Sequence, residues 1–139
     1  MDLKEIEILL DNNDIDIDKI EEIYNELNEE YNKLFEEGES TDRIEELIIR
    51  LIKQNNINGE ILSDISLINS FNVLDELVRL EKTPIDVIYD VLNENDDILN
   101  YHILDYPNIT KEIIERLLDN GDEKTKIKAK EKLDKLQID

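Results

Sequence analysis

Aliphatic side chains recur every three or four residues along most of the chain, which is the spacing of one helical face. In residues 1–56 this pattern predicts three helices. The first covers 2–10, the second ends near Glu37 before Gly38, and the third follows Ser40 or Thr41. The apolar face of the second helix is expected to contain Ile20, Ile23, Leu27, Tyr31 and Leu34.

A register of 26 residues organises the rest of the chain. Segments 57–65, 83–91 and 109–117 can be written above one another without gaps, and an acid followed by two aliphatics recurs in each. The three copies are Glu60-Ile61-Leu62, Asp86-Val87-Ile88 and Glu112-Ile113-Ile114. A fixed period of this kind is typical of helical units that cover one another's apolar faces, so we expect the units to stack.

Each unit is predicted to hold two short helices. The three units are 57–81, 83–107 and 109–136, with the helices at 59–68 and 73–80, 84–93 and 97–105, 111–120 and 123–136. One continuous core is expected to include Ile61, Ile65, Val87, Val91, Ile113 and Leu117.

Polar residues in front of the apolar runs predict the helix starts. Asp14 or Asp16 is expected to cap the second helix. Thr110 is expected to cap the helix at 111–120, and Asp122 the last helix. Gly38 is expected to end the second helix.

The predicted class is all-α, with no strands. At 139 residues the chain is long enough for one compact domain, with an N-terminal part at 1–56 and repeats at 57–139. Zero cysteines exclude disulfides and thiolate metal sites. No apolar run or basic leader indicates a membrane span or a secretion signal, so a cytoplasmic protein is expected.

The negative charge is concentrated in two thirds of the chain. The net charge is −21: residues 1–56 hold 18 acids and 6 bases, residues 57–108 hold 11 and 2, and residues 109–139 hold 8 of each. Such a charge disfavours binding to nucleic acid or an anionic membrane and attracts basic proteins. It also arises from compositional bias alone, because most charge runs are only solvated faces.

The residues that could carry chemistry do not form a recognisable catalytic or metal site. The run 14–18 resembles the start of a calcium loop, but Lys19 stands where glycine is needed and Asn25 where a glutamate is needed. His102 is the only histidine, which excludes zinc sites built on several histidines and leaves a helix position beside Tyr101. We therefore expect no enzyme activity, no cofactor and no metal.

The last predicted helix is rich in lysine. Its cations favour the negative end of the helix dipole and can pair with Glu123 and Glu131. Nucleic-acid binding is disfavoured here because the lysines surround the helix and arginine and aromatic residues are absent. A soluble helix that caps the end of the stack is the better interpretation.

Two stretches carry a family resemblance. Segment 83–88 followed by 95–108 resembles a variant leucine-rich repeat, the HEAT-like unit of paired short helices, and 121–129 is similar to the second half of that unit. Tyr106 departs from the pattern, since asparagine is usual in that turn, and the cysteine cluster found before the repeats in some members is absent. The resemblance covers about residues 57–136 and implies a short right-handed α-solenoid used for protein contact.

Two functions from different classes follow. In the first, the chain is a non-enzymatic acidic inhibitor that covers the nucleic-acid-binding face of a basic partner, such as a nuclease or a nucleic-acid-guided effector, as immunity and anti-CRISPR proteins do. In the second, it is a HEAT-like adaptor whose acidity serves solubility alone. For the first, the expected partner-binding residues lie opposite the apolar face of the second helix: Glu22, Glu26, Glu29, Glu30, Glu36 and Glu37.

Overall fold

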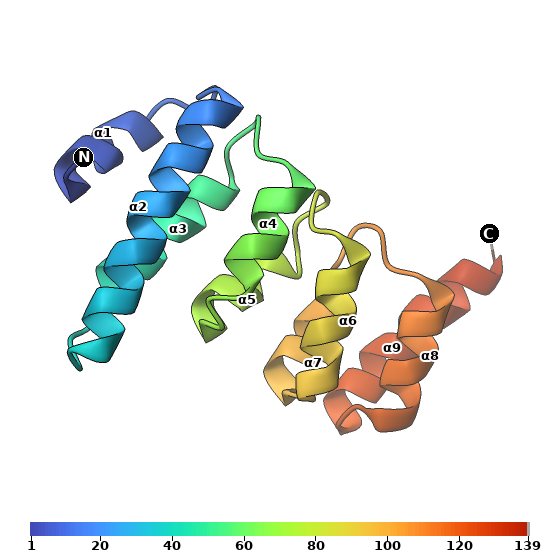
Figure 1. Ribbon diagram of the computed structural model, residues 1–139. Coiled ribbons are helices and arrows are strands. Elements are labelled where there is room, and N and C mark those ends of the chain that lie inside the picture. The colour runs from blue at the N-terminus through green and yellow to red at the C-terminus, as the bar shows by residue number, and fades with distance from the viewer. Residues whose placement is uncertain (139) are drawn as a thin grey trace. The chain divides into compact units, whose positions relative to one another are not determined.

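The computed structural model describes residues 1–138, and their side chains as far as Leu136. Over this range the chain forms nine helices and no strand, so the all-α prediction is confirmed (Figure 1). The helices are α1 (Leu3–Leu10), α2 (Ile17–Glu36), α3 (Asp42–Ile52), α4 (Gly59–Ser66), α5 (Phe71–Leu77), α6 (Ile85–Glu94), α7 (Asp97–Ile103), α8 (Lys111–Asn120) and α9 (Glu123–Ile138).

The 26-residue register reappears in the helix boundaries. The helices α4, α6 and α8 begin at 59, 85 and 111, and α5, α7 and α9 begin at 71, 97 and 123. Both sets are spaced by the same 26 residues that separate the aligned sequence segments. The predicted division of residues 57–136 into six short helices is therefore confirmed, although α4 and α7 end two residues earlier than expected and α5 ends three residues earlier.

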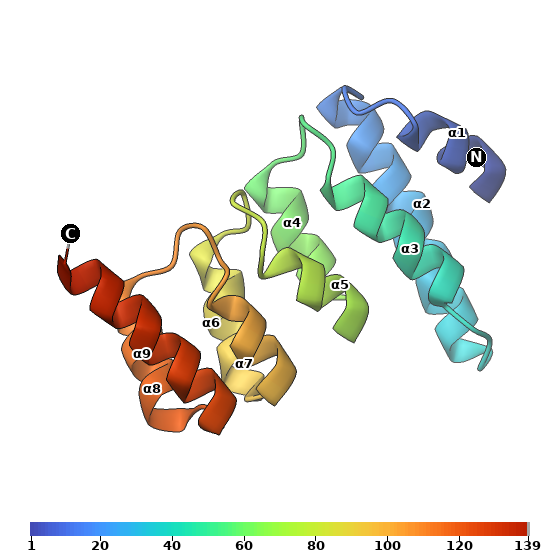
Figure 2. The same ribbon diagram turned by 180° about the vertical axis from the view of Figure 1, so that it is seen from behind.

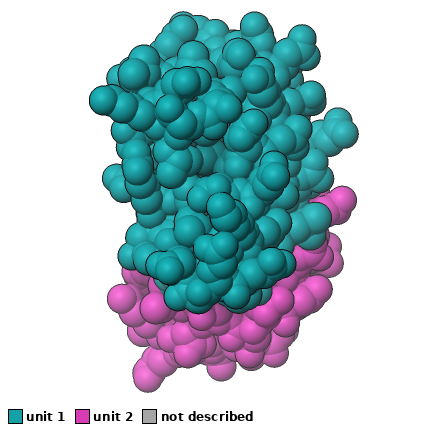
Figure 3. Space-filling model, turned by 60° about the vertical axis from the view of Figure 1, so that its left-hand side comes forward, with its two compact units in different colours: residues 1–73 teal, residues 74–139 magenta. Residues whose placement is uncertain are grey.

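The chain divides into two compact units, Met1–Val73 and Leu74–Asp139 (Figure 3). The boundary falls inside α5. Each unit is described separately below. The predicted organisation, one compact domain with an N-terminal part at 1–56 and repeats at 57–139, stays a prediction.

In the first unit, α2 and α3 lie side by side, α1 contacts α3 and α4 contacts α2 (Figures 1 and 2). These contacts follow from the apolar stripes, because each helix buries the face on which its aliphatic residues recur. The fully buried side chains of this unit include Ile6, Ile20, Ile23, Leu27, Ile44, Ile48, Leu51, Leu62 and Ile65.

The loop at 11–16 is fixed by amide side chains that follow α3. Gln54 is 2% exposed, and its Nε2 donates to the Asn12 carbonyl at 2.8 Å. The Asn55 Nδ2 donates to the Asp14 carboxylate at 2.7 Å. Gln54 therefore supplies a hydrogen bond to the backbone of this loop, and Asn55 supplies one to a loop side chain.

Most of the predicted caps are confirmed. Asp16, rather than Asp14, accepts from the backbone of α2 at 2.9 Å, and Asp122 does the same for α9 at 2.9 Å. Thr110 caps α8 at 3.3 Å. Gly38 has a φ of 71°, so a residue with a Cβ would be strained there.

In the second unit, α6 contacts α7, α7 contacts α9, and α8 lies along α9. The predicted core residues Val87, Val91, Ile113 and Leu117 are all buried here, as Ile61 and Ile65 are in the first unit. Their burial is confirmed, and one core continuous through all six stays a prediction.

The contacts of the Tyr106 side chain account for a tyrosine at this position, where the repeat pattern has asparagine. Its side chain is buried, and its hydroxyl donates to the Thr83 carbonyl at 2.7 Å, while the Thr83 hydroxyl donates to the Leu77 carbonyl at 2.7 Å. The pKa of the Tyr106 phenol is raised, because the effect of burial outweighs the lowering effect of its hydrogen bond with Asn108. The phenol thus joins the turn after α7 to the turn before α6.

We expect Ile113→Ala to lower the free energy of unfolding by about 2 to 5 kcal/mol, because it leaves a cavity at a fully buried position. Urea unfolding followed by circular dichroism measures this loss. Ile127→Ala in α9 is the matched control, since Ile127 is 58% exposed and its loss should change stability by only about 0.5 kcal/mol. Equal effects of the two substitutions would contradict the burial of Ile113.

Candidate functional site

The six glutamates predicted to bind a partner all lie on or beside α2. The helix has 20 residues and is about 30 Å long, and it buries Ile20, Ile23 and Leu27 on its apolar face. Four of the six side chains are exposed and two are half-buried. We call the six residues the acidic row: Glu22, Glu26, Glu29, Glu30, Glu36 and Glu37.

Most of the acidic row has no cationic partner in the described part of the chain. The Glu22 carboxylate pairs with Lys19 at 2.9 Å, and Glu26 lies 4.0 Å from the amino group of Met1. The other four carboxylates make no ion pair within residues 1–138. The row is therefore a source of negative potential that the protein itself leaves largely unneutralised.

The last two members lie where a helix tolerates carboxylates least. Glu36 is the final residue of α2, and Glu37 is its C-terminal cap, so both lie at the negative end of the helix dipole. Lys33 is the only base in that turn. Carboxylates at this end of a helix are unfavourable for its stability, so folding does not account for their presence.

An exposed aromatic residue lies in the last turn of α2, next in sequence to Glu36, and was missed by the sequence analysis. Phe35 is 70% exposed, and its ring stacks on Tyr31 with 6.2 Å between the centroids. Burial raises the pKa of the Tyr31 phenol, with the nearby Glu45 carboxylate as a second cause. The available signal was the position of Phe35 one step outside the apolar face, which separates it from the buried stripe.

Glu45 is the exception among the glutamates of this unit. It lies in the first turn of α3 but is only 9% exposed, and its carboxylate accepts from the hydroxyls of Thr41, at 3.0 Å, and of Ser70. The partner Ser70 lies 25 residues away, so no local pattern indicates this contact. Glu45 is a structural carboxylate and not part of the exposed row.

The aspartates of the run 14–18 serve the fold. Asp14 accepts from Asn55, Asp16 caps α2, and Asp18 lies in the first turn of that helix. No group of three or more metal-ligating side chains occurs in the described residues. The three carboxylates therefore have structural partners or positions of their own.

His102 lies half-buried on α7, as predicted for a helix residue beside Tyr101. Its Nδ1 contacts the Asp75 carboxylate, whose second oxygen accepts from Arg79 at 3.3 Å. This arrangement joins α5 to α7 through a charged hydrogen bond, and neither a serine nor a second histidine belongs to it.

The lysines of α9 have other partners than those expected. Lys128 pairs with Asp105 at 2.9 Å, and Lys130 lies 3.7 Å from Asp134, so pairing with Glu123 and Glu131 was wrong. Lys124 and Lys128 also lie over the Tyr101 ring, at 4.6 and 4.2 Å from its centroid. These cations therefore hold α9 against α7.

Comparisons with known proteins leave the site to be interpreted from its geometry alone. A scan against protein-family models and searches of curated proteins and solved structures found no match. Within residues 1–138, no helix combines the length and the apolar character needed to cross a bilayer.

We expect replacement of Glu29, Glu36 and Glu37 by glutamine to leave stability unchanged or slightly higher, within about 0.5 kcal/mol, because these exposed charges repel one another and the helix end. Thermal unfolding of the variant measures this. Glu45→Gln is the matched control and should lower stability by about 1 to 3 kcal/mol, since it disturbs a buried pair of hydrogen bonds. A marked loss of stability in the triple variant would show that these carboxylates serve the fold.

Proposed function

We propose that this protein is a non-enzymatic inhibitor that binds a basic protein and covers its nucleic-acid-binding face. A nuclease or a nucleic-acid-guided effector is the expected kind of partner, as for immunity and anti-CRISPR proteins, and the cytoplasm is the expected setting. The observation that carries the proposal is the acidic row, in which four of six carboxylates make no ion pair within the described residues.

The spacing of the acidic row supports partial mimicry of a nucleic-acid strand. Carboxylates three or four residues apart on a helix are separated by about 5 to 6 Å along its axis. Phosphates on one DNA strand follow one another every ~3.4 Å along the duplex axis. The row therefore has the sign and the linear order of a phosphate backbone, although its steps of 4, 3, 1, 6 and 1 residues are less regular.

Charge of this kind mainly accelerates the encounter and contributes less to the lifetime of the complex. Residues 1–56 contain 18 of the 37 acids, so a basic surface is attracted to this part of the chain. A lasting complex also requires buried apolar contact at its centre. Phe35, 70% exposed in the last turn of α2 beside Glu36 in the sequence, is the apolar side chain that we assign to that contact.

The alternative is a HEAT-like adaptor, and the helix starts spaced by 26 residues favour it. In this proposal α4–α9 form a short right-handed solenoid of helix pairs, and its surface holds a protein through apolar contacts. Leu67 at 79% exposed and Ile98 at 56% exposed are side chains of the type required. Binding by such contacts would be insensitive to salt, whereas binding through the acidic row would weaken steeply as salt rises.

We expect a variant with Glu22, Glu29, Glu36 and Glu37 replaced by glutamine to lose capture of the basic partner, because the electrostatic attraction falls while the side-chain size is kept. Immobilised wild-type protein and variant are exposed to cell extract at low salt, and the bound proteins are identified by mass. The captured protein is then tested for DNA or RNA binding in competition with the wild-type chain.

The control removes four charges elsewhere. Asp86, Asp90, Glu94 and Asp97 are exposed residues of α6 and α7, and their replacement by asparagine or glutamine changes the net charge equally. This control should still capture the partner. Equal loss in both variants would reduce the effect to net charge, and retention of the partner by both would exclude the acidic row as the binding surface.

We expect Phe35→Ala to weaken the same complex by about tenfold or more through faster dissociation, because the aromatic contact assigned to it is removed. Surface plasmon resonance with the purified partner separates the two rate constants. The four-glutamine variant should instead slow association. Since Phe35 is largely exposed, stability should stay within about 0.5 kcal/mol of the wild type.

A further inference from the structure

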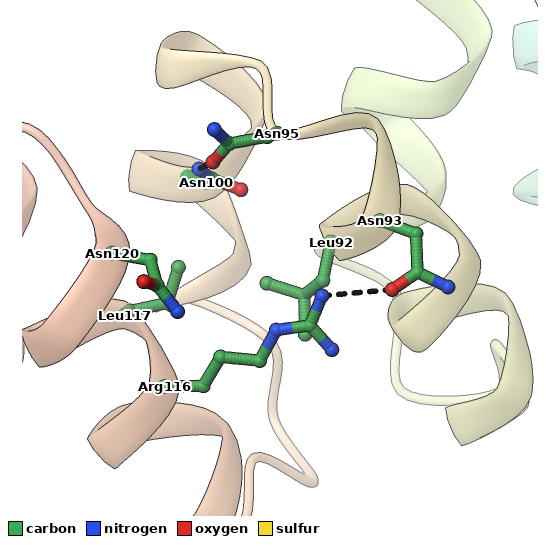
Figure 4. Close-up of a pocket in the computed structure, with 7 residues that line it drawn as sticks. All are labelled: Leu92, Asn93, Asn95, Asn100, Arg116, Leu117 and Asn120. Atoms are coloured by element: carbon green, nitrogen blue, oxygen red, sulfur yellow. Dashed lines mark hydrogen bonds between the residues drawn. The ribbon is translucent and has the colours of Figure 1, made fainter.

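A polar pocket of about 270 Å³ lies among α6, α7 and α8, remote in sequence from the acidic row (Figure 4). Leu92 and Leu117 supply its apolar surface, and both side chains are almost fully buried. The remaining wall consists of four asparagines and one arginine. No carboxylate lines the pocket, although the sequence contains 37 acidic residues.

Asn100 gives the pocket a buried acceptor without a partner. The residue is 2% exposed, and its Nδ2 donates to the Asn95 side-chain oxygen at 3.1 Å. Its Oδ1 makes no hydrogen bond within the described residues and is directed into the pocket (Figure 4). A buried acceptor left in this state lowers stability, so a donor from a ligand is the group it lacks.

Arg116 differs from the other three arginines of the chain. Arg43, Arg50 and Arg79 each donate to a carboxylate, at 3.1, 2.8 and 3.3 Å. Arg116 makes no ion pair within residues 1–138, and its Nη2 donates to the Asn93 side-chain oxygen at 2.7 Å. A guanidinium has five N–H donors in a planar fork, so the donors not used by Asn93 can receive a carboxylate.

These groups define the ligand by what each one needs. Arg116 requires an anion, and its planar fork matches a carboxylate. Asn100 requires an N–H donor, and a neutral one is favoured because no carboxylate in the pocket could neutralise an ammonium. We propose that this pocket binds an acylamino carboxylate, with the carboxylate on Arg116 and the amide N–H on the Asn100 oxygen.

The other asparagines complete this assignment. Asn120 lies on α8 one turn beyond Arg116, and its amide offers both a donor and an acceptor to the acyl group (Figure 4). A pocket of about 270 Å³ is at the lower limit for small-molecule sites, so it accommodates one or two amino-acid residues and no more. Two sources have this chemistry: a free N-acyl amino acid and the C-terminus of a polypeptide.

The test uses N-acetylglycine as the probe and the full chain labelled with ¹⁵N. Saturable amide shifts confined to residues 92–100 and 116–120 are expected. N-acetylglycinamide removes the negative charge, and N-acetylsarcosine replaces the N–H by a methyl group. Each should bind about tenfold more weakly or worse, because each loses one of the two recognised groups. Equal binding of the three probes, or the lack of saturable shifts with N-acetylglycine, would overturn the proposal.

An acetylated tripeptide, which carries the same acylamino carboxylate at its C-terminus, distinguishes the two sources. Tighter binding of the tripeptide than of N-acetylglycine identifies a polypeptide C-terminus as the ligand. Weaker binding identifies a free N-acyl amino acid.

Two variants connect binding to the assigned side chains. Arg116→Gln should lower affinity by about tenfold or more, while Arg43→Gln, which removes an ion-paired arginine from the other unit, should leave it unchanged. Asn100→Leu should abolish binding with little change in the thermal midpoint, because its oxygen has no partner in the free protein and the Nδ2 bond that it loses goes to Asn95, an exposed residue that water can reach. Unchanged affinity in Arg116→Gln would exclude the assigned site.

Discussion

Every helix in this chain except α2 and α9 is too short to be stable by itself, and this dependence on tertiary burial governs the structure. The two shortest, α5 and α7, have seven residues each, whereas isolated helices need about 12 to 15 residues to be even marginally stable in water. Their aliphatic stripes must therefore be covered by neighbouring helices. Because the net charge of −21 opposes compaction, most acids lie at helix starts or on exposed faces, and the buried Glu45 is an exception.

This constraint explains which parts of the fold could be predicted. Helix starts depend on local signals, namely a capping side chain followed by a periodic apolar stripe, and Asp16, Thr110 and Asp122 cap where the sequence predicts. The 26-residue spacing is likewise a local pattern repeated along the chain. The arrangement of the helix pairs in space depends on contacts between segments, which the pattern alone does not specify.

The features missed by the sequence analysis all depend on such distant contacts. Glu45 is buried because Ser70 reaches it from 25 residues away, and Gln54 holds a loop about 40 residues earlier. Tyr106 interrupts the expected asparagine turn, yet its hydroxyl reaches the Thr83 carbonyl. Asn100 and Arg116 look like ordinary helix residues until α6, α7 and α8 place them around one pocket. For the candidate binding surface the sequence predicts the carboxylates but not the exposed Phe35 on the same helix.

The hydrogen-bond partners separate two kinds of polar residue that composition cannot distinguish. Asp16 and Asp122 accept from free backbone amides at helix starts, so the fold itself requires them. Glu36 and Glu37 lie at the opposite end of a helix, where their charge is unfavourable. The buried Asn100 oxygen likewise has no partner in the described chain. Groups that lower stability and are nevertheless present are better explained by binding than by folding, and both proposals rest on groups of this second kind.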